Sequence, residues 1–308
     1  MNALPEWVWI AAVLVAALTQ TIRNTAQRSL ADSAGPVGAS LARFLYGLPF
    51  ALLCALAVQA SFGARNPLPD VNGMFWLWLV VGAIAHALGS VCLMSAMRSG
   101  SFVVAVALSK TEVVQIAVFA TIILAEAPNA YSAAGMVFAL LGALLLSTRG
   151  KGHHAAAASR RQILLSTFYG VATGACYALA AVGYRAAGLE LTNLGHSAIL
   201  VACWCVLLAQ GVQVGTLGLW MLARERASVL AIFTDWRLSL AAGFAGTAAS
   251  VGWYIGYVLR PAADVRVLGM VEVVFSYLVS RHLLGERPRL RENIAITLVV
   301  IGAIFACL

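Results

Sequence analysis

The chain has 308 residues, of which 62% are hydrophobic and 10% are charged, and 20 Lys and Arg against 12 Asp and Glu give a formal charge of +8. A soluble domain carries about 25% charged residues, so this composition excludes a soluble enzyme, a nucleic-acid-binding protein and a disordered chain. It predicts a multi-span membrane protein whose excess basic residues lie in loops that fix its orientation.

Apolar runs of about 20 residues predict an all-α integral membrane protein with ten transmembrane helices. The runs cover 7–29, 36–60, 73–97, 101–124, 131–149, 162–184, 196–221, 238–259, 262–284 and 291–307. Between them we expect a turn with a Pro helix start at 32–36, a loop at 63–69, tight corners at 98–101 and 260–261, and a long polar linker at 149–161. No basic segment precedes Trp7, so we expect the first run to remain as a span.

The two halves of the chain repeat at an offset of 160 residues. Glu112-Val-Val114 matches Glu272-Val-Val274, and Glu126 and Pro128 match Glu286 and Pro288, in a chain with only eight glutamates. Five helices per copy is an odd number, so the second copy must enter the membrane in the opposite orientation. Such inverted repeats are the usual construction of secondary transporters. We therefore predict a first repeat at 1–149, a polar linker at 150–161 and a second repeat at 162–308.

This half-repeat combines an interior Glu in its fourth helix, a Glu-x-Pro corner and a Gly-Ala-rich fifth helix, and it is similar to the EamA domain. Gly285-Glu-Arg-Pro288 resembles the Gly-Glu corner of that domain closely, whereas Ala125-Glu-Ala-Pro128 has Ala in place of the Gly. Arg43-Phe44 also resembles the family. The whole chain resembles the drug/metabolite transporter superfamily in its ten-helix, two-domain form. The resemblance implies two packed EamA-like domains and transport of a small metabolite, for which we expect export; it names no cargo.

Basic residues are distributed unequally between the two sides of the predicted helices. Thirteen lie in or beside the odd-numbered connections: Arg28, Arg98, Arg149, Lys151, Arg160, Arg161, Arg224, Arg226, Arg237, Arg281, Arg287, Arg289 and Arg291. Arg65, Arg260 and Arg185, which we expect near a helix end, lie on the other side. The positive-inside rule then predicts cytoplasmic odd-numbered loops and periplasmic termini in an inner-membrane protein.

Polar and aromatic residues within the spans are candidates for a substrate cavity, because charges in the membrane interior usually face a cavity or a partner. The candidates are Gln20, Arg23, Asn24, Arg43, His86, Lys110, Glu112, Trp253, Tyr257, Arg266 and Glu272. The equivalent Glu112 and Glu272 either line a central cavity, one of them coupling transport to protons, or anchor helices through Arg or backbone partners. Lys110 lies about 200° around a helix from Glu112, so it needs another partner or water. Lys110 and Arg266 are specificity candidates, because their counterparts are Met270 and Val106.

Helix one carries Gln20, Arg23, Asn24 and Gln27 on one stripe, which must point inward unless Arg23 snorkels to the interface. With Arg43 and Lys110, Arg23 would form a cationic mouth that favours an anionic or zwitterionic metabolite. Trp253 and Tyr257 lie on one face of a helix, where they either line a pocket for a small organic molecule or serve only in packing. Trp7, Trp9, Trp76, Trp78, Trp220 and Trp236 predict an interfacial belt.

The sequence offers no signature of a cofactor or a metal site. The six cysteines lie in apolar runs and are read as small hydrophobic residues, and His153-His154 has no third ligand nearby. No Walker A motif supports an ATP-driven step. We expect alternating access, driven either by facilitated diffusion or by proton exchange, and the oligomeric state stays open. The alternatives are a membrane-embedded enzyme or lipid-handling protein, and a structural or sensory subunit without flux.

Overall fold

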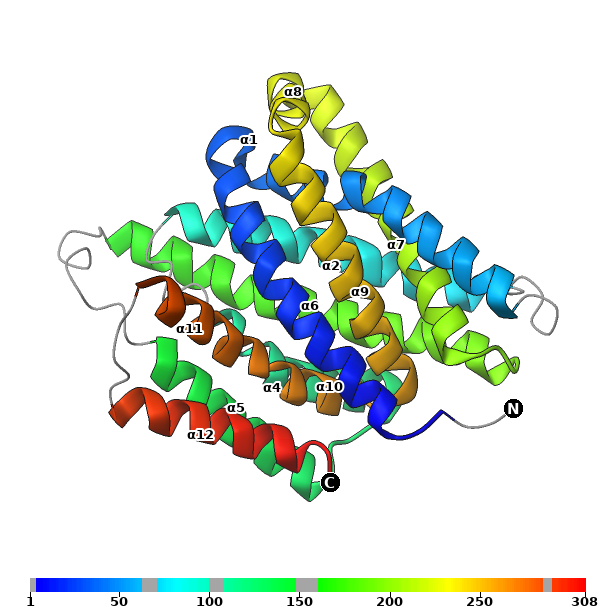
Figure 1. Ribbon diagram of the computed structural model, residues 1–308, viewed down its shortest axis with the longest axis vertical. Coiled ribbons are helices and arrows are strands. Elements are labelled where there is room, and N and C mark those ends of the chain that lie inside the picture. Colours follow the sequence, from blue (N-terminus) through cyan, green and yellow to red (C-terminus); the bar gives the residue numbers. More distant parts are fainter. Residues whose placement is uncertain (1–3, 63–70, 100–107, 148–159, 285–289) are drawn as a thin grey trace. The chain divides into compact units, whose positions relative to one another are not determined.

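The computed structural model describes residues 4–62, 71–99, 108–147, 160–284 and 290–308 (Figure 1). These ranges contain helices joined by short turns and no strand, as the all-α prediction requires. Within these ranges, five helices are long and apolar enough to cross a membrane, and Glu112–Leu124 and Ala130–Leu146 are shorter apolar helices. The predicted loop at 63–69, most of the linker at 149–161 with His153 and His154, and the corner at 285–288 lie outside the described residues.

The first helix, α1 (Trp7–Phe62), contains the first two predicted spans, separated by a kink at Gly35. Gly35 has φ 73° and ψ 172°, a conformation that a residue with a Cβ atom rarely adopts. Pro36 follows and lacks the N–H that a continuous helix would need, so it begins the second segment. The predicted break at 32–36 is therefore confirmed as a sharp kink.

The other described helices follow the predicted spans with three differences besides the break before Glu112 in the fourth span. They are α2 (Gly73–Ser99), α4 (Glu112–Leu124), α5 (Ala130–Ser147), α6 (Arg160–Asn193), α7 (Ala198–Arg224), α8 (Arg226–Thr234), α9 (Trp236–Leu259), α10 (Ala262–Gly269), α11 (Val271–Leu284) and α12 (Leu290–Phe305). The short α8 was not predicted, α6 continues past residue 184, and the ninth span is divided at Met270. Counting α1 as two segments and α10 with α11 as one, and leaving out the connecting α8, the described helices supply the ten spans.

The helices pack into two compact units. Unit 1 consists of Met1–Ala87 and Leu179–Pro261, and unit 2 consists of Leu88–Ala178 and Ala262–Leu308. The boundaries fall inside α2 and α6, and each unit combines helices from both halves of the chain. The packing units therefore differ from the sequence repeats at 1–149 and 162–308, and that division stays a prediction.

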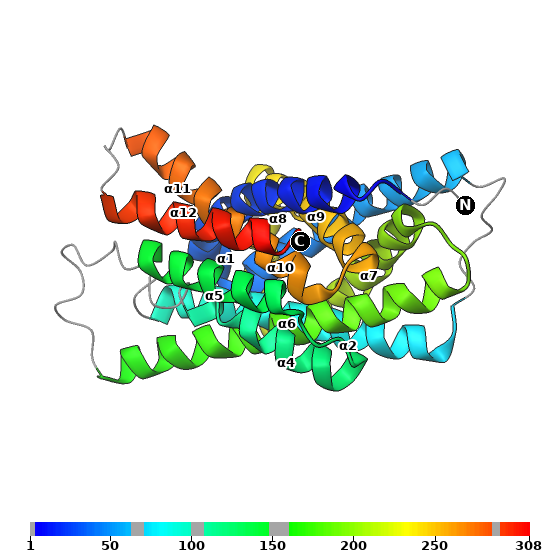
Figure 2. The same cartoon turned by 90° about the horizontal axis from the view of Figure 1, so that it is seen from below.

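In unit 2, α5 and α12 lie side by side (Figure 2). A Cβ atom at Gly135 would lie 2.8 Å from the carbonyl oxygen of Gly302, and one at Gly142 would lie 2.6 Å from that of Ala295. Adding the offset of 160 to residues 135 and 142 gives residues 295 and 302. The contact between 135 and 302 is therefore equivalent to the contact between 142 and 295. The helices are antiparallel, and small residues permit their close approach. This symmetric contact agrees with the inverted repeat.

In unit 1, α9 packs against both segments of α1 (Figure 1). A Cβ atom at Gly252 would lie 2.4 Å from the carbonyl oxygen of Ala12 in the first segment. One at Gly243 would lie 2.7 Å from the backbone nitrogen of Gly47 in the second segment. Glycines on α9 thus let the backbones approach to a distance that larger residues would prevent.

The outer surfaces of the helices are apolar. Ile122, Phe168 and Leu219 are among many large hydrophobic side chains that are more than half exposed. Such a surface suits hydrocarbon rather than water. Trp7, Trp76, Trp220 and Trp236 are exposed as the predicted belt requires, but Trp9 is buried beneath the Arg260 guanidinium, whose Cζ lies 5.5 Å from the Trp9 ring centroid.

Candidate functional site

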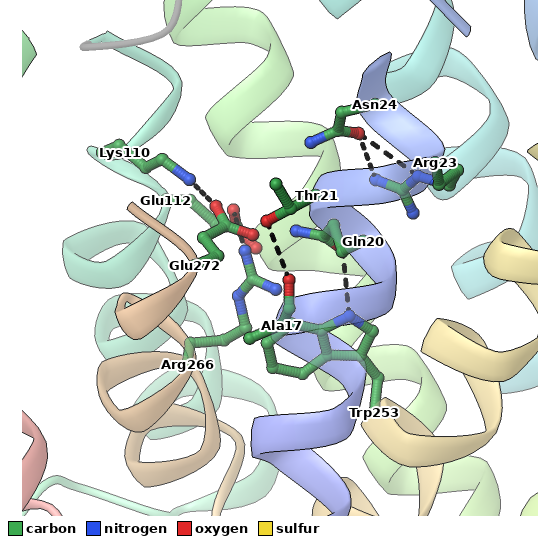
Figure 3. A network of polar contacts seen from close by, with 10 residues as sticks. All are labelled: Ala17, Gln20, Thr21, Arg23, Asn24, Lys110, Glu112, Trp253, Arg266 and Glu272. Atoms are coloured by element: carbon green, nitrogen blue, oxygen red, sulfur yellow. Dashed lines mark hydrogen bonds and ion pairs between the residues drawn. The ribbon is translucent and has the colours of Figure 1, made fainter. Parts of the chain in front are cut away.

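Four charged residues form a buried quartet in unit 2 (Figure 3). The Arg266 Nη2 atom donates a hydrogen bond of 2.7 Å to Oε2 of Glu112, and the Lys110 ammonium forms an ion pair with the Glu272 carboxylate. No side chain of the four is more than 10% exposed. Each glutamate therefore receives a cation from the other half of the sequence.

Both glutamates lie just after a break in the helix. Glu112 is in the first turn of α4 and Glu272 is in the first turn of α11. Around the breaks, i→i+3 hydrogen bonds occur: Val113 N–H to the Lys110 carbonyl at 3.3 Å, and Val273 N–H to the Met270 carbonyl at 3.0 Å. Residues 110 and 270 are equivalent at the offset of 160. A carboxylate in the first turn of a helix is favoured by the helix dipole, so the breaks help to hold both negative charges.

These breaks correct the geometry expected for Lys110. The sequence predicted a continuous helix over 101–124, on which Lys110 and Glu112 would face apart. Lys110 instead occupies the turn before α4, and its partner is Glu272. The crossed pairs have the form of the interhelix anchors that we considered for the two glutamates. The cavity-lining alternative stays a prediction.

A hydrogen-bonded chain in unit 1 joins Arg43, His86, Tyr184 and Gln213. Nη2 of Arg43 lies 3.1 Å from Nε2 of His86, and Nδ1 of His86 lies 3.1 Å from the Tyr184 hydroxyl. A guanidinium can only donate, so Nε2 accepts and Nδ1 of His86 carries the proton that it donates to Tyr184. The Gln213 amide also donates to Tyr184, at 3.1 Å. Tyr184 and Gln213 were not predicted, although both are polar residues within apolar runs, which is the signal that selected Gln20.

The polar stripe on the first segment of α1 is turned into unit 1, as predicted (Figure 3). The Trp253 indole N–H donates to Oε1 of Gln20 at 2.9 Å, and Nη2 of Arg23 donates to Oδ1 of Asn24 at 2.8 Å. Gln27 donates to the carbonyl of Ala39 at 3.1 Å. Arg23 is 3% exposed, so it does not snorkel to the interface.

Arg23 and Arg43 both approach Gly246 of α9. A Cβ atom at Gly246 would lie 2.9 Å from Cγ of Arg43 and 3.4 Å from Cδ of Arg23. The side chains of both buried arginines thus pack beside the same glycine inside unit 1. Lys110 belongs to unit 2, and the three-residue cationic mouth stays a prediction.

The aromatic candidates on α9 are packed. The Trp253 and Tyr257 rings stack with centroids 6.3 Å apart and planes inclined by 20°, and both residues are buried. Since Trp253 also donates to Gln20, these residues fix α9 against the first segment of α1. Their role as a pocket wall stays a prediction.

Arg185 lies inside α6 rather than near a helix end. Nη1 of Arg185 donates to the carbonyls of Tyr257 and Arg260, at 2.7 Å each, where α9 ends. This buried cation satisfies terminal carbonyls of α9 and therefore does not belong to a loop. The expected position of Arg185 is wrong because α6 continues to Asn193.

Unit 2 also contains two acidic residues that the sequence did not single out. Asp264 of α10 accepts a hydrogen bond from the hydroxyl of Ser132 of α5. Glu292 of α12 accepts one of 2.9 Å from the Tyr277 hydroxyl of α11. Both acids are buried. They were overlooked because each lies near the start of an apolar run, where a charge is unremarkable in sequence.

The described helices, apolar and long enough to cross a membrane, define a helical multi-pass membrane protein. Residues 7–148 match the model of the EamA-like transporter family, which confirms the resemblance inferred from the sequence.

A solved structure titled "Crystal structure of protein" superposes with a TM-score of 0.68 at 18% identity, covering 96% of this chain and 95% of that one. This similarity supports the fold alone. No curated protein sequence matches this chain.

Proposed function

We propose that the chain is a secondary transporter that moves a small organic metabolite across the inner membrane by alternating access, as an exporter. One observation carries this proposal: helix breaks at positions 160 residues apart, each followed by a buried glutamate. Discontinuous helices with charged residues are where secondary transporters bind substrates and coupling ions.

An anionic or zwitterionic cargo is supported by Arg23 and Arg43. Both are buried in unit 1 beside Gly246, and they donate to the neutral groups of Asn24 and His86. A planar guanidinium binds a carboxylate or phosphate through two parallel hydrogen bonds. Lys110 already pairs with Glu272, so a cargo that used Lys110 would have to displace that carboxylate.

The driving force is proposed to be either facilitated diffusion or proton exchange. In the second case, protonation of Glu112 or Glu272 would release Arg266 or Lys110 and so connect proton uptake to movement around the breaks.

The excess of basic residues in odd-numbered connections supports cytoplasmic loops there and periplasmic termini. A reporter that is active only in the cytoplasm should be silent when fused at Leu308, and activity there would contradict this orientation.

A metabolite screen tests the proposed function. Cells with and without expression are compared for metabolites released into the medium, at two external pH values. We expect one or a few carboxylates, phosphates or amino acids to be released only with expression. Arg43→Gln should abolish this release at an equal amount of protein in the membrane, whereas Arg161→Gln, at an exposed position of α6, should not.

If expression causes no metabolite flux from cells, and the purified chain causes none in proteoliposomes, the enzymatic or structural alternatives are favoured. Flux that does not respond to the pH gradient would remove proton exchange. Equal release by Arg43→Gln and the unmodified chain would remove the anionic-cargo proposal.

A further inference from the structure

The short helix α8 connects α7 with α9 (Figure 1). This connection carries an exposed surface that combines arginines with large apolar side chains. Its centre is the nine-residue α8, which follows the end of α7 and precedes the start of α9, all within unit 1. α7 has 27 residues and is about 40 Å long, more than the hydrocarbon thickness of about 30 Å. We therefore expect the short helix at the end of this span to lie at the level of the lipid headgroups.

One face of α8 holds the helix against the protein. Ile232 is fully buried, and its carbonyl accepts a hydrogen bond of 2.9 Å from the buried hydroxyl of Ser239. At the other end of the connection, the Ser33 hydroxyl donates to Oδ2 of Asp235 at 2.6 Å, which ties it to α1. These contacts fix which side of α8 faces outward.

The outward face has Arg226, Leu230 and Phe233 at spacings of four and three residues, which places them on a single stripe. Leu230 is 69% exposed and Phe233 is 54% exposed. Arg226 is also exposed, and its Nε donates to the Leu222 carbonyl at 3.0 Å. The stripe therefore begins with a cation and continues with two side chains that water would solvate poorly.

Two more arginines flank the stripe. Arg224 is exposed in the last turn of α7, and exposed Arg237 stands over the ring of exposed Trp236, with Cζ 5.5 Å from the centroid. Tryptophan and arginine are the residues that anchor proteins at the membrane interface. Three exposed arginines against the two acids Glu225 and Asp235 leave this surface with a net positive charge of one.

We propose that α8, with Arg224, Arg226 and Arg237, is a binding surface for anionic phospholipid headgroups. Leu230 and Phe233 insert between acyl chains, and the arginines contact the phosphates. A helix with an apolar face and cationic flanks binds the interface in this way, with a strength that depends on anionic lipid. This inference concerns lipid selectivity and does not rest on the proposed transport.

Quenching of Trp236 by brominated lipid tests the proposal. The full chain is reconstituted in mixtures of unlabelled lipid with brominated phosphatidylglycerol or brominated phosphatidylcholine, and the Trp236 signal is the difference between the unmodified chain and Trp236→Phe. We expect half-maximal quenching at about fivefold less anionic than zwitterionic lipid, which is the effect of one net positive charge, because Glu225 and Asp235 offset two of the three arginines. The preference should fall in 1 M salt, where screening is strong.

In the triple variant R224Q/R226Q/R237Q, both brominated lipids should quench Trp236 equally. Arg260→Gln is the matched control, because Arg260 follows the opposite end of the 24-residue α9 and should leave the preference unchanged. Equal quenching of the unmodified chain by both lipids would overturn the proposal, and so would a preference that survives in the triple variant. If the triple variant does not fold, a preference of the unmodified chain that salt does not reduce overturns it.

Discussion

Replacing Lys110 by Met separates an anchoring role of this residue from a role in binding cargo. Met is the residue that the second repeat has at the equivalent position 270, so the change introduces a side chain that the fold already accepts there. It removes the cation that pairs with Glu272, whose side chain is 7% exposed. Removing one partner of a buried ion pair costs about 3–5 kcal/mol, because the other charge stays buried.

The position of Glu272 reduces that cost. Glu272 is in the first turn of α11, and the helix dipole stabilises a carboxylate there by about 0.3–1 kcal/mol. We therefore expect Lys110→Met to lower the free energy of unfolding by about 2–4 kcal/mol. Lys110→Met combined with Glu272→Gln removes both charges, and it should recover most of the loss, leaving a deficit of about 1 kcal/mol.

Denaturant unfolding of the purified chain in detergent, for the unmodified chain, both single variants and the double variant, measures this coupling directly. Lys110→Arg is the control that retains the charge, and it should keep most of the stability. Additive effects of the two single changes would refute the anchoring role. Unchanged stability together with lost transport in Lys110→Met would place Lys110 with the cargo instead.

Three further changes have expected effects on stability, each measured by thermal unfolding of the purified chain. Ala125→Gly should stabilise the chain by about 0.5–1 kcal/mol. Ala125 caps α4 with φ 55°, in the left-handed region that costs a residue other than glycine about 1–2 kcal/mol. A lower unfolding temperature of the variant would contradict this strain. Gly142→Ala should destabilise the chain by about 1–3 kcal/mol, since the new methyl group would lie 2.6 Å from the Ala295 carbonyl oxygen. In the control Gly211→Ala on α7, the methyl group meets nothing within 4 Å, so this change should be neutral or stabilising. Arg185→Met should cost about 2–4 kcal/mol, because it removes two charge-assisted hydrogen bonds to carbonyls at the end of α9, and a loss below 1 kcal/mol would show that this cap is unimportant.

The spans could be predicted because a membrane helix must be apolar along about 20 residues, and that signal does not depend on tertiary contacts. The kink at Gly35 was visible for a similar reason, since a Gly-Pro pair has few local alternatives. The breaks at Lys110 and Met270 were invisible because exchanging i→i+4 for i→i+3 hydrogen bonds leaves hydropathy unchanged. The end of α6 was misplaced because Arg185 was taken as a boundary, although a buried arginine with backbone partners is compatible with a helix.

The candidate residues could be selected from sequence, but their partners could not. Comparison of the repeats marked Lys110 and Arg266 as residues without a charged counterpart, and both proved to be buried ion-pair partners. Which glutamate each one meets depends on how helices from the two halves pack in unit 2, and no local pattern encodes that. Tyr184 and Gln213 were missed because single polar residues are common in apolar runs, and the hydrogen bonds that join them to Arg43 through His86 depend on tertiary packing.

The crossed pairs have a consequence for the proposed alternating access. The two glutamates are equivalent at the offset of 160, but their cations come from different places: Lys110 from a helix break and Arg266 from the last turn of α10. If the repeats exchange conformations, the backbone of the outward-open state mirrors that of the inward-open state, whereas the cations cannot exchange positions. The difference between a Lys–Glu and an Arg–Glu environment would then contribute to the energy difference between the two states. Under the proposed mechanism, this asymmetry would favour one resting side without any contact to cargo.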